Sequence, residues 1–165
     1  MPFVVEWIDR CEEPARDIAV KTPAGQLLLT VRGDVIINMD WIIGIASSVP
    51  GDGHWQILFD AYWQDWNRPL EVKLLNQGTP YRRQVWAELC RIPFGETRTY
   101  AALARILGSA ARAVGNACRD NPYAPIIPCH RIISSSGLGG YCGAIDGALM
   151  EIKIQLLRFE AEHRR

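Results

Sequence analysis

Hydrophobic and polar positions follow two different rhythms along this chain. In residues 1–50 short apolar runs are separated by turn signals, among them Thr22-Pro23-Ala24-Gly25 and Gly33-Asp34. Short runs bounded by Gly, Pro and Asp are typical of strands joined by tight turns. We therefore predict a hairpin-rich sheet, followed by an amphipathic helix at 55–66 whose aromatic stripe packs into a core.

From Thr79 onward the apolar spacing becomes helical. The stretch Asn76-Gln77-Gly78-Thr79-Pro80 predicts a boundary between an N-terminal domain, 1–78, and a C-terminal domain, 79–165. Thr79 followed by Pro80 favours a helix start. The Thr side chain can accept a hydrogen bond from a backbone N–H of the first turn, and Pro has no backbone N–H that would need a partner there. The apolar stripe of this helix is expected at Val85, Trp86, Leu89 and Ile92.

Two shorter helices are predicted next, with Thr99 capping 100–107 and Ser109 capping 110–119. Their connection, Leu107-Gly108-Ser109, predicts a helix-turn-helix. In that motif the second helix enters a groove of DNA, which would place Arg112 near the contacting end. Helix pairs with Gly turns also occur in proteins that do not bind DNA, so this pattern alone leaves both readings open.

Charge is distributed unevenly, although the formal net charge of the 165 residues is zero. Residues 1–78 hold six basic and eleven acidic side chains, whereas residues 79–165 hold twelve basic and seven acidic ones, a net charge of +5. Eleven of those twelve cations are Arg, which binds phosphate in a bidentate way. The asymmetry favours a polyanion as partner of the second half, with chance segregation as the alternative.

Overall composition is that of an ordinary globular protein, with 48% apolar and 22% charged residues. The apolar stretch 35–45 is interrupted by Asn38 and Asp40 and is too short to span a membrane. No secretion signal is recognisable at the start of the sequence. We therefore predict a soluble, cytoplasmic protein without a membrane partner.

The stretch with the most evident chemistry is Ile127-Pro128-Cys129-His130-Arg131-Ile132, which we interpret as the end of a buried strand. A thiolate is a strong nucleophile whose reactivity depends on the groups that lower its pKa. The alternative is a buried structural Cys. The spacing of the five cysteines predicts neither a zinc site nor a disulfide framework.

A carboxylate could complete the site. Glu160 lies beside the apolar stripe of a last helix, predicted from about Ala148, and a Cys–His–Glu relay results if it reaches His130. Neighbouring side chains of a strand point to opposite faces. Cys129 and His130 would therefore need a turn or a bridging water to communicate.

Together these motifs resemble those of the O6-alkylguanine-DNA alkyltransferases, over about residues 80–160. The resemblance is carried by Pro128-Cys129-His130-Arg131, by Phe94-Gly95-Glu96 with Tyr100, and by Arg112-Ala113-Val114-Gly115 with Asn121-Pro122. It implies an α/β (α+β) fold with an N-terminal RNase H-like sheet and helix. The C-terminal part would be a helical, winged helix-turn-helix-like domain that holds the reactive cysteine.

The resemblance also implies residue roles. Cys129 would accept the alkyl group, His130 would deprotonate it through a water, Glu160 would orient His130, and Asn121 would join the recognition helix to the active site. The substrate pocket would comprise Tyr100, Ile132, Tyr141, Cys142 and Lys153. DNA would be contacted by Arg112, which replaces the extruded nucleotide, and by Tyr100, Ala113, Gly115 and Arg131.

The implied activity is direct DNA repair. An alkyl group would pass irreversibly from O6-alkylguanine, and from O4-alkylthymine, to Cys129 after the base is flipped out. The partner would be double-stranded DNA held by its minor groove, and the protein would be a monomer without cofactor or metal. Two alternatives are a plain winged-helix DNA-binding module, which would not use Cys129, and a cysteine hydrolase, which would turn over.

Four departures from the family pattern stand out. The loop before Tyr141 and the turn of the helix-turn-helix are short, which is closest to archaeal-type members. Cys142 stands where Ser is more common, and residues 145–150 look like an insertion.

Overall fold

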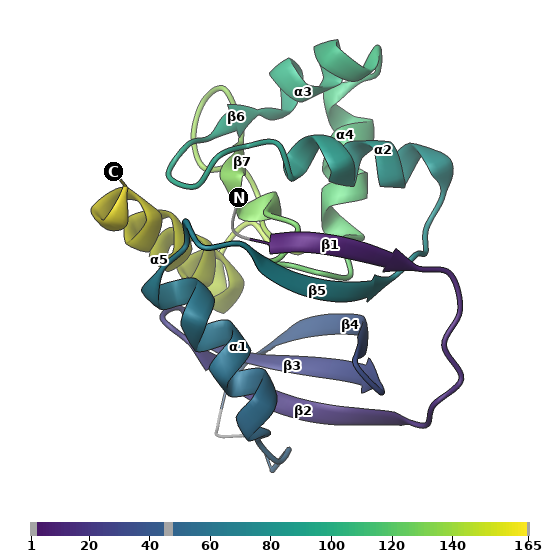
Figure 1. Cartoon of the computed structure of the whole chain (residues 1–165). Coiled ribbons are helices and arrows are strands. Elements are labelled where there is room, and N and C mark those ends of the chain that lie inside the picture. Colours follow the sequence, from purple (N-terminus) through teal and green to yellow (C-terminus); the bar gives the residue numbers. More distant parts are fainter. Residues whose placement is uncertain (1–2, 45–47, 165) are drawn as a thin grey trace. The chain divides into compact units, whose positions relative to one another are not determined.

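The computed structural model describes residues 3–44 and 48–164, and it divides into two compact units, Met1–Gln77 and Gly78–Arg165 (Figure 1). The N-terminal unit contains β1 (Phe3–Ile8), β2 (Ala15–Thr22), β3 (Gly25–Arg32), β4 (Val35–Ile42), α1 (Gly53–Gln64) and β5 (Leu70–Leu75). The C-terminal unit contains α2 (Pro80–Leu89), β6 (Arg98–Thr99), α3 (Tyr100–Leu107), α4 (Ala111–Arg119), a 3-10 turn (Cys129–Arg131), β7 (Ile132–Ile133) and α5 (Gly147–His163).

The five strands of the N-terminal unit form one sheet in the order β1-β5-β4-β3-β2. Strands β2, β3 and β4 make the predicted antiparallel hairpins, and their inward positions, such as Leu27, Leu29 and Val31, are fully buried. Strand β5 was not predicted; it lies parallel to both β1 and β4. The predicted run 35–45 ends as a strand at Ile42, and Ile45 falls outside the described residues.

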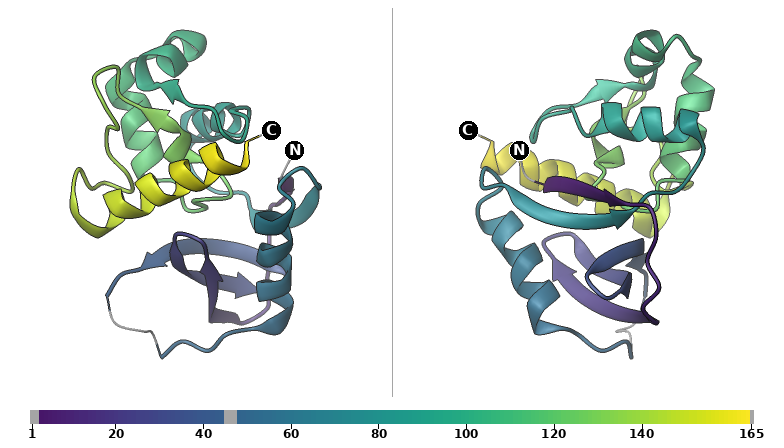
Figure 2. Two further views of the ribbon diagram at one scale, coloured as in Figure 1. Left: turned by 90° about the vertical axis from the view of Figure 1, so that its left-hand side faces the viewer. Right: turned by 45° about the vertical axis from the view of Figure 1, so that its right-hand side comes forward.

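Helix α1 contacts β2 and lies along the sheet (Figure 2). It begins two residues before the predicted start because Asp52 caps it, accepting a hydrogen bond from Trp55 N at 3.2 Å. Its buried side chains are aromatic: Trp55, Phe59, Tyr62 and Trp63. The predicted packing of the aromatic stripe into a core is thus confirmed.

In the C-terminal unit the helix starts follow the predicted caps at two of three positions. Thr79 accepts from Arg82 N at 3.1 Å, and Thr99 accepts from Ala102 N at 3.0 Å. The prediction for Ser109 was wrong: α4 begins one residue later behind Ala110, without a side-chain cap. The Ser109 hydroxyl instead lies 2.6 Å from the Tyr81 hydroxyl, which ties the turn to α2.

Helices α3 and α4 pack against each other and against α2. Gly108 ends α3 in the left-handed conformation, with φ of 61°, which glycine adopts without steric cost. The buried Trp86 of α2 donates its indole N–H to Ala117 O at 2.8 Å. The helix-turn-helix is therefore held on a third helix rather than standing alone.

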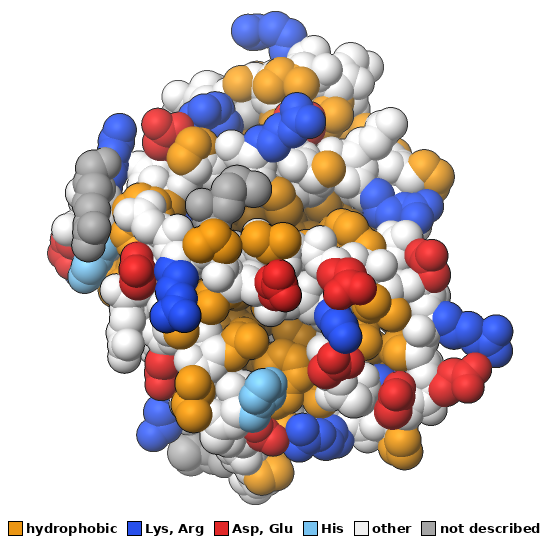
Figure 3. All heavy atoms as spheres, in the orientation of Figure 1, with side chains coloured by type: hydrophobic (Ala, Val, Ile, Leu, Met, Phe, Trp, Pro, Cys, Tyr) orange, Lys and Arg blue, Asp and Glu red, His pale blue; other side chains and the backbone are white. Residues whose placement is uncertain are grey.

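Figure 3 shows acidic and basic side chains interspersed with apolar ones on the face drawn there. No large patch of a single sign is visible on that face. Within residues 3–44 and 48–164, no helix combines the length and apolar character that crossing a membrane requires.

Candidate active site

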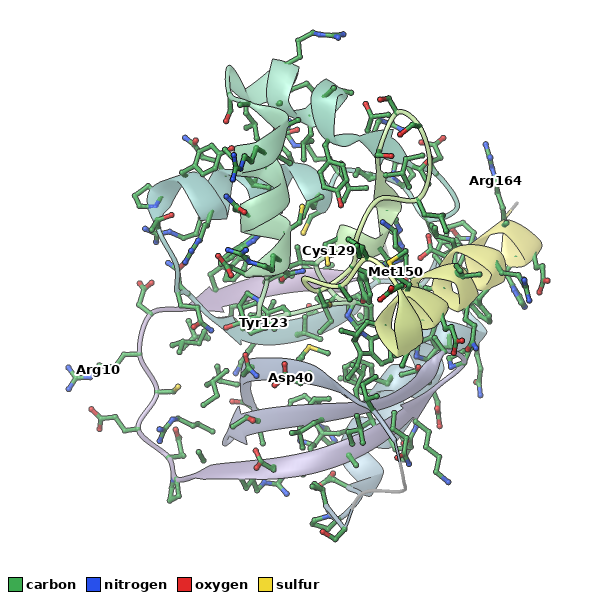
Figure 4. All side chains as sticks on the ribbon, turned by 180° about the vertical axis from the view of Figure 1, so that it is seen from behind. Arg10, Asp40, Tyr123, Cys129, Met150 and Arg164 are labelled. Carbon is green, nitrogen blue, oxygen red and sulfur yellow. The ribbon has the colours of Figure 1, made fainter. Side chains whose placement is uncertain are left out.

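The reactive segment is a turn and not the strand end that was predicted. Residues Cys129–Arg131 form a single 3-10 turn, closed by a hydrogen bond from Arg131 N to Pro128 O at 3.0 Å, and β7 begins only at Ile132. In a 3-10 turn, successive side chains do not alternate between two faces as they do in a strand. Cys129 is only 2% exposed, and Figure 4 labels it among the elements of the C-terminal unit.

Backbone pairing and one amide side chain position this turn. Strand β7 pairs with β6 in parallel, with Ile132 opposite Arg98, and Tyr100 at the start of α3 lines the same pocket as Cys129. Asn121 follows α4 and donates from Nδ2 to Ile127 O at 2.8 Å, while its Oδ1 accepts from Tyr123 N at 2.9 Å. Asn121 therefore links the end of α4 to the segment that enters the turn.

Glu160 of α5 is the centre of a buried polar network. Its Oε2 lies 2.5 Å from His130 Nε2, and both side chains are about 1% exposed. Its Oε1 accepts from Arg131 Nε at 2.8 Å and from Gly95 N at 3.1 Å. The predicted approach of Glu160 to His130 is present in the structure.

Arg131 is placed differently from the predicted DNA contact. Its side chain is 3% exposed, and its Nη2 also reaches Glu160 Oε2 at 3.1 Å. Its Nη1 donates to Ile92 O at 2.8 Å. Buried charges require paired partners, and in this structure the guanidinium of Arg131 finds its partners inside the protein.

The network fixes the protonation of the histidine. Burial raises the pKa of Glu160, but the neighbouring His130 and Arg131 outweigh burial and bring that pKa down to about 2. Burial lowers the pKa of His130 despite the attraction of Glu160, so the imidazole is neutral near pH 7. A neutral imidazole donates through one nitrogen only. Since Nε2 faces an ionised carboxylate, Nε2 carries the hydrogen.

The other ring nitrogen is therefore the basic one. Nδ1 of His130 is buried and has no hydrogen-bond partner among the described residues. An unpaired lone pair on a buried imidazole can take a proton from a neighbouring acid. The arrangement leaves His130 poised as a base with Glu160 behind it.

Cys129 itself has a lowered pKa. Hydrogen bonding from the Cys142 side chain lowers it most, burial opposes this, and Asn121 and the charge of Lys153 lower it further. Lys153 is fully buried and donates from Nζ to three carbonyls, Ile132 O at 2.7 Å, Leu138 O at 2.6 Å and Gly140 O at 2.9 Å. Burial lowers the pKa of Lys153 to about 8.

A pocket of about 170 Å³ opens above Cys129. Of the predicted residues, the pocket wall contains Tyr100, Gly115, Cys129, Tyr141 and Cys142. The wall also contains residues that were not predicted: Asn116, Cys118, Arg119, Gly140, Gly143, Ala144 and Ile145. Helical spacing from Gly115 could have indicated two of them, since positions three and four residues further on share its face.

Besides Arg131, four of the residues predicted to bind substrate or DNA do not line this pocket. Ile132 is completely buried in β7, and Lys153 lies behind the wall, where it holds the Gly140 carbonyl. Arg112 and Ala113 belong to the first turn of α4 and do not line the pocket; Arg112 is exposed.

The outer wall is a tight turn. Tyr141 N donates to Ala144 O at 2.8 Å and Ala144 N donates back to Tyr141 O at 2.9 Å. The two central residues, Cys142 and Gly143, have φ of 51° and 86°. Positive φ at both central positions is characteristic of a type I′ turn, in which a residue with a Cβ is strained.

These features define a class: a protein with a helix-turn-helix and a buried, activated cysteine beneath a small pocket. A family model described as "6-O-methylguanine DNA methyltransferase, DNA binding domain" matches residues 80–162. A methylated-DNA–protein-cysteine methyltransferase of Methanosarcina barkeri is 36% identical over 158 residues, which cover 88% of this chain and 97% of that protein. The chain belongs to the methylated-DNA–protein-cysteine methyltransferase family.

Solved structures agree with this assignment. The crystal structure of the Mycobacterium tuberculosis O6-methylguanine methyltransferase has a TM-score of 0.75 at 32% identity, covering 92% of this chain and 96% of that one. The M. tuberculosis protein in complex with DNA has a TM-score of 0.72 at 34% identity, covering 89% and 93%. The predicted mixed α/β fold, with an N-terminal sheet and helix and a C-terminal helical DNA-binding domain, is confirmed.

Coverage differs between relatives. A probable methylated-DNA–protein-cysteine methyltransferase of Acanthamoeba polyphaga mimivirus is 46% identical over 99 residues. That alignment spans 59% of this chain and 60% of the viral protein.

Proposed function

We propose that this chain repairs DNA directly by moving the alkyl group of O6-alkylguanine onto its own Cys129. The observation that carries the proposal is the buried Glu160–His130 pair, whose His directly follows a cysteine of lowered pKa at the base of a pocket. Family membership supplies the substrate class. O4-alkylthymine, which carries its alkyl group on an equivalent exocyclic oxygen, is a second substrate in this proposal.

The chemistry is a single displacement. His130 Nδ1 takes the thiol proton of Cys129 through a water, and the imidazolium is stabilised by Glu160. The thiolate then attacks the alkyl carbon, an S–C bond forms, and the electrons of the breaking C–O bond pass to the guanine. Burial raises the pKa of Tyr100 to about 12, so its hydroxyl stays protonated and can donate to the departing base.

Reaching Cys129 requires the base to leave the stack. The cysteine is 2% exposed, so a base held inside a duplex cannot contact its sulfur. In our proposal α4 enters the minor groove and Arg112 fills the space left by the extruded nucleotide, while Tyr100 turns the adjacent phosphate. Support comes from the placement of α4, whose first turn exposes Arg112 and whose later turns line the pocket.

The product is a thioether, which has no good leaving group, so each molecule acts once. The lesion brings the alkyl group, so the reaction needs no cofactor or metal, and one chain holds the whole site, so a monomer suffices. The relatives are both archaeal and mycobacterial, so the archaeal subtype is part of the proposal. Its support is the short loop before Tyr141. The cytoplasmic location stays a prediction.

Intact mass after incubation with duplex DNA carrying O6-methylguanine tests the proposal. We expect the wild type to gain one methyl group and no more, Cys129→Ala to gain none, and the control Cys11→Ala to behave as wild type. A parallel duplex with O4-methylthymine tests the second substrate. An unchanged mass with DNA still bound would support a plain binding module, and multiple turnover would support a hydrolase.

A further inference from the structure

Three of the five cysteines meet at one pocket. Cys118 comes from α4, Cys129 from the 3-10 turn and Cys142 from the type I′ turn, and all three line the same cavity. Alkyl transfer uses the sulfur of Cys129 as the only acceptor. Two more thiols therefore share the pocket of the acceptor without being acceptors themselves.

Cys142 faces the same pocket as the nucleophile, and hydrogen bonding from its side chain is the strongest influence that lowers the pKa of Cys129. A disulfide requires the two sulfurs to approach to about 2.05 Å with a dihedral angle near 90°. The segment that carries Cys142 is rich in glycine, with Gly137, Gly139 and Gly140 before it and Gly143 after it. Such a backbone can make the small adjustment that closing the bond requires.

We propose that Cys129 and Cys142 form a reversible disulfide when a peroxide enters the pocket. The Cys129 thiolate attacks one peroxide oxygen, the O–O bond breaks, and Cys129 becomes a sulfenic acid while the other oxygen leaves as water. The Cys142 sulfur then attacks the Cys129 sulfur, the S–O bond breaks, and a second water leaves. Two thiols and one hydrogen peroxide thus give one disulfide and two waters.

The surroundings favour this pair. Oxidation selects cysteines with thiolate character and access to solvent, especially beside a second thiol that can resolve the sulfenic acid. Cys129 has the lowered pKa and faces a cavity large enough for a peroxide molecule. Burial raises the pKa of Cys118, which keeps it a protonated thiol, whereas Cys142 is only partly buried at the pocket rim.

The disulfide would protect the acceptor. A sulfenic acid that is not resolved proceeds to sulfinic and sulfonic acids, which thiol reductants do not reverse. Capture by Cys142 stops that sequence, and a dithiol restores both thiols. For repair the consequence would be a pause in activity instead of a permanent loss of the acceptor. That consequence rests on the proposed function, whereas formation of the disulfide does not.

The test is peroxide treatment of the full chain in the absence of DNA, followed by alkylation of the remaining thiols, digestion and mass spectrometry. We expect a linked peptide pair containing Cys129 and Cys142, a mass lower by two hydrogen atoms, and full reversal by dithiothreitol. Cys142→Ser should instead add two or three oxygen atoms at Cys129, irreversibly. The matched control Cys118→Ser should still form the linked pair.

Three results would overturn the proposal. These are an oxidised wild type without the linked pair, a bond from Cys129 to Cys118, and equal overoxidation of wild type and Cys142→Ser. Because no DNA is present, each of these outcomes leaves the repair proposal untouched. A chain that forms the disulfide but accepts no methyl group when reduced would refute the repair proposal alone.

Discussion

Replacing Glu160 with Gln tests the buried network with the smallest change in shape. The carboxylate accepts hydrogen bonds from His130 Nε2, from two nitrogens of Arg131 and from Gly95 N. An amide has the same size, but it carries no charge and offers one acceptor oxygen in place of two. Arg131, at 3% exposed, would then lose the carboxylate with which it is paired in the interior.

The cost can be estimated from that geometry. Removing one member of a buried ion pair typically destabilises a protein by 3–5 kcal/mol, and the retained amide hydrogen bond suggests the lower end, about 3 kcal/mol. For a chain of this size that corresponds to a drop in Tm of roughly 6–12 °C. The rate should also fall, because an amide N–H turned toward Nε2 would favour the tautomer in which Nδ1 is no longer basic. General-base catalysis contributes roughly 10²–10⁴-fold, so we expect a loss in that range.

The assay has two readouts on the same preparations. Thermal unfolding gives the change in Tm, and single-turnover transfer from an O6-methylguanine duplex gives the rate at a temperature where both proteins are folded. Glu162→Gln is the matched control, because Glu162 lies on the same helix but is exposed. It should change neither quantity appreciably.

The two readouts separate the two parts of the reasoning. A Glu160→Gln protein that melts with the wild type would show that Arg131 does not need this carboxylate. A protein that transfers methyl at the wild-type rate would show that Glu160 does not set the tautomer of His130. Both results together would refute the relay.

Three further outcomes are expected. The pKa of Glu160 in the folded protein is about 2, below its usual 4.5. Its contribution of about 3 kcal/mol to the free energy of unfolding is therefore complete above pH 4.5 and is lost as the pH falls toward 2. Urea midpoints across this pH range should decline in the wild type but not in Glu160→Gln. Gly143→Ala places a Cβ on a residue with φ of 86°, 3.2 Å from an arginine side chain of α4. Chemical denaturation should therefore show a loss of about 1–2 kcal/mol in the free energy of unfolding. In the control Gly137→Ala the added Cβ meets no neighbour, so the loss should be smaller. Arg112→Ala should weaken binding to lesion-containing duplex by about 1–3 kcal/mol without lowering Tm, and Arg158→Ala on α5 should affect binding less, as measured by fluorescence anisotropy.

The helices were predictable because their signals are local. Thr79 and Thr99 cap helices where the residue types suggested, and Gly108 ends one by adopting a conformation that other residues avoid. The strand Leu70–Leu75 was missed although its burial alternates, with Val72 and Leu74 inside. Its place is between β1 and β4, a long-range pairing that no neighbouring residue indicates.

The site divides in the same way. Cys129, His130 and Glu160 could be proposed from residue type and from the resemblance. The 3-10 turn could not be predicted, because the stretch 127–132 resembles the end of a buried strand. The contacts that favour a turn come from residues distant in the sequence. The burial of Arg131 and Lys153 was equally hidden, since a charged side chain is normally exposed and only the folded structure supplies the partners that offset its desolvation.

The wide separation of the network along the chain has a consequence for biosynthesis. Glu160 lies on a helix that begins at Gly147, and its hydrogen-bond partners are Gly95, His130 and Arg131. A nascent chain that has reached β7 already contains the nucleophile, but it lacks the carboxylate that orients His130 and it lacks Cys142 and Lys153, two of the groups that lower the pKa of Cys129. Translation order therefore delays the full activation of the thiol until the segment from Cys142 to Glu160 has emerged.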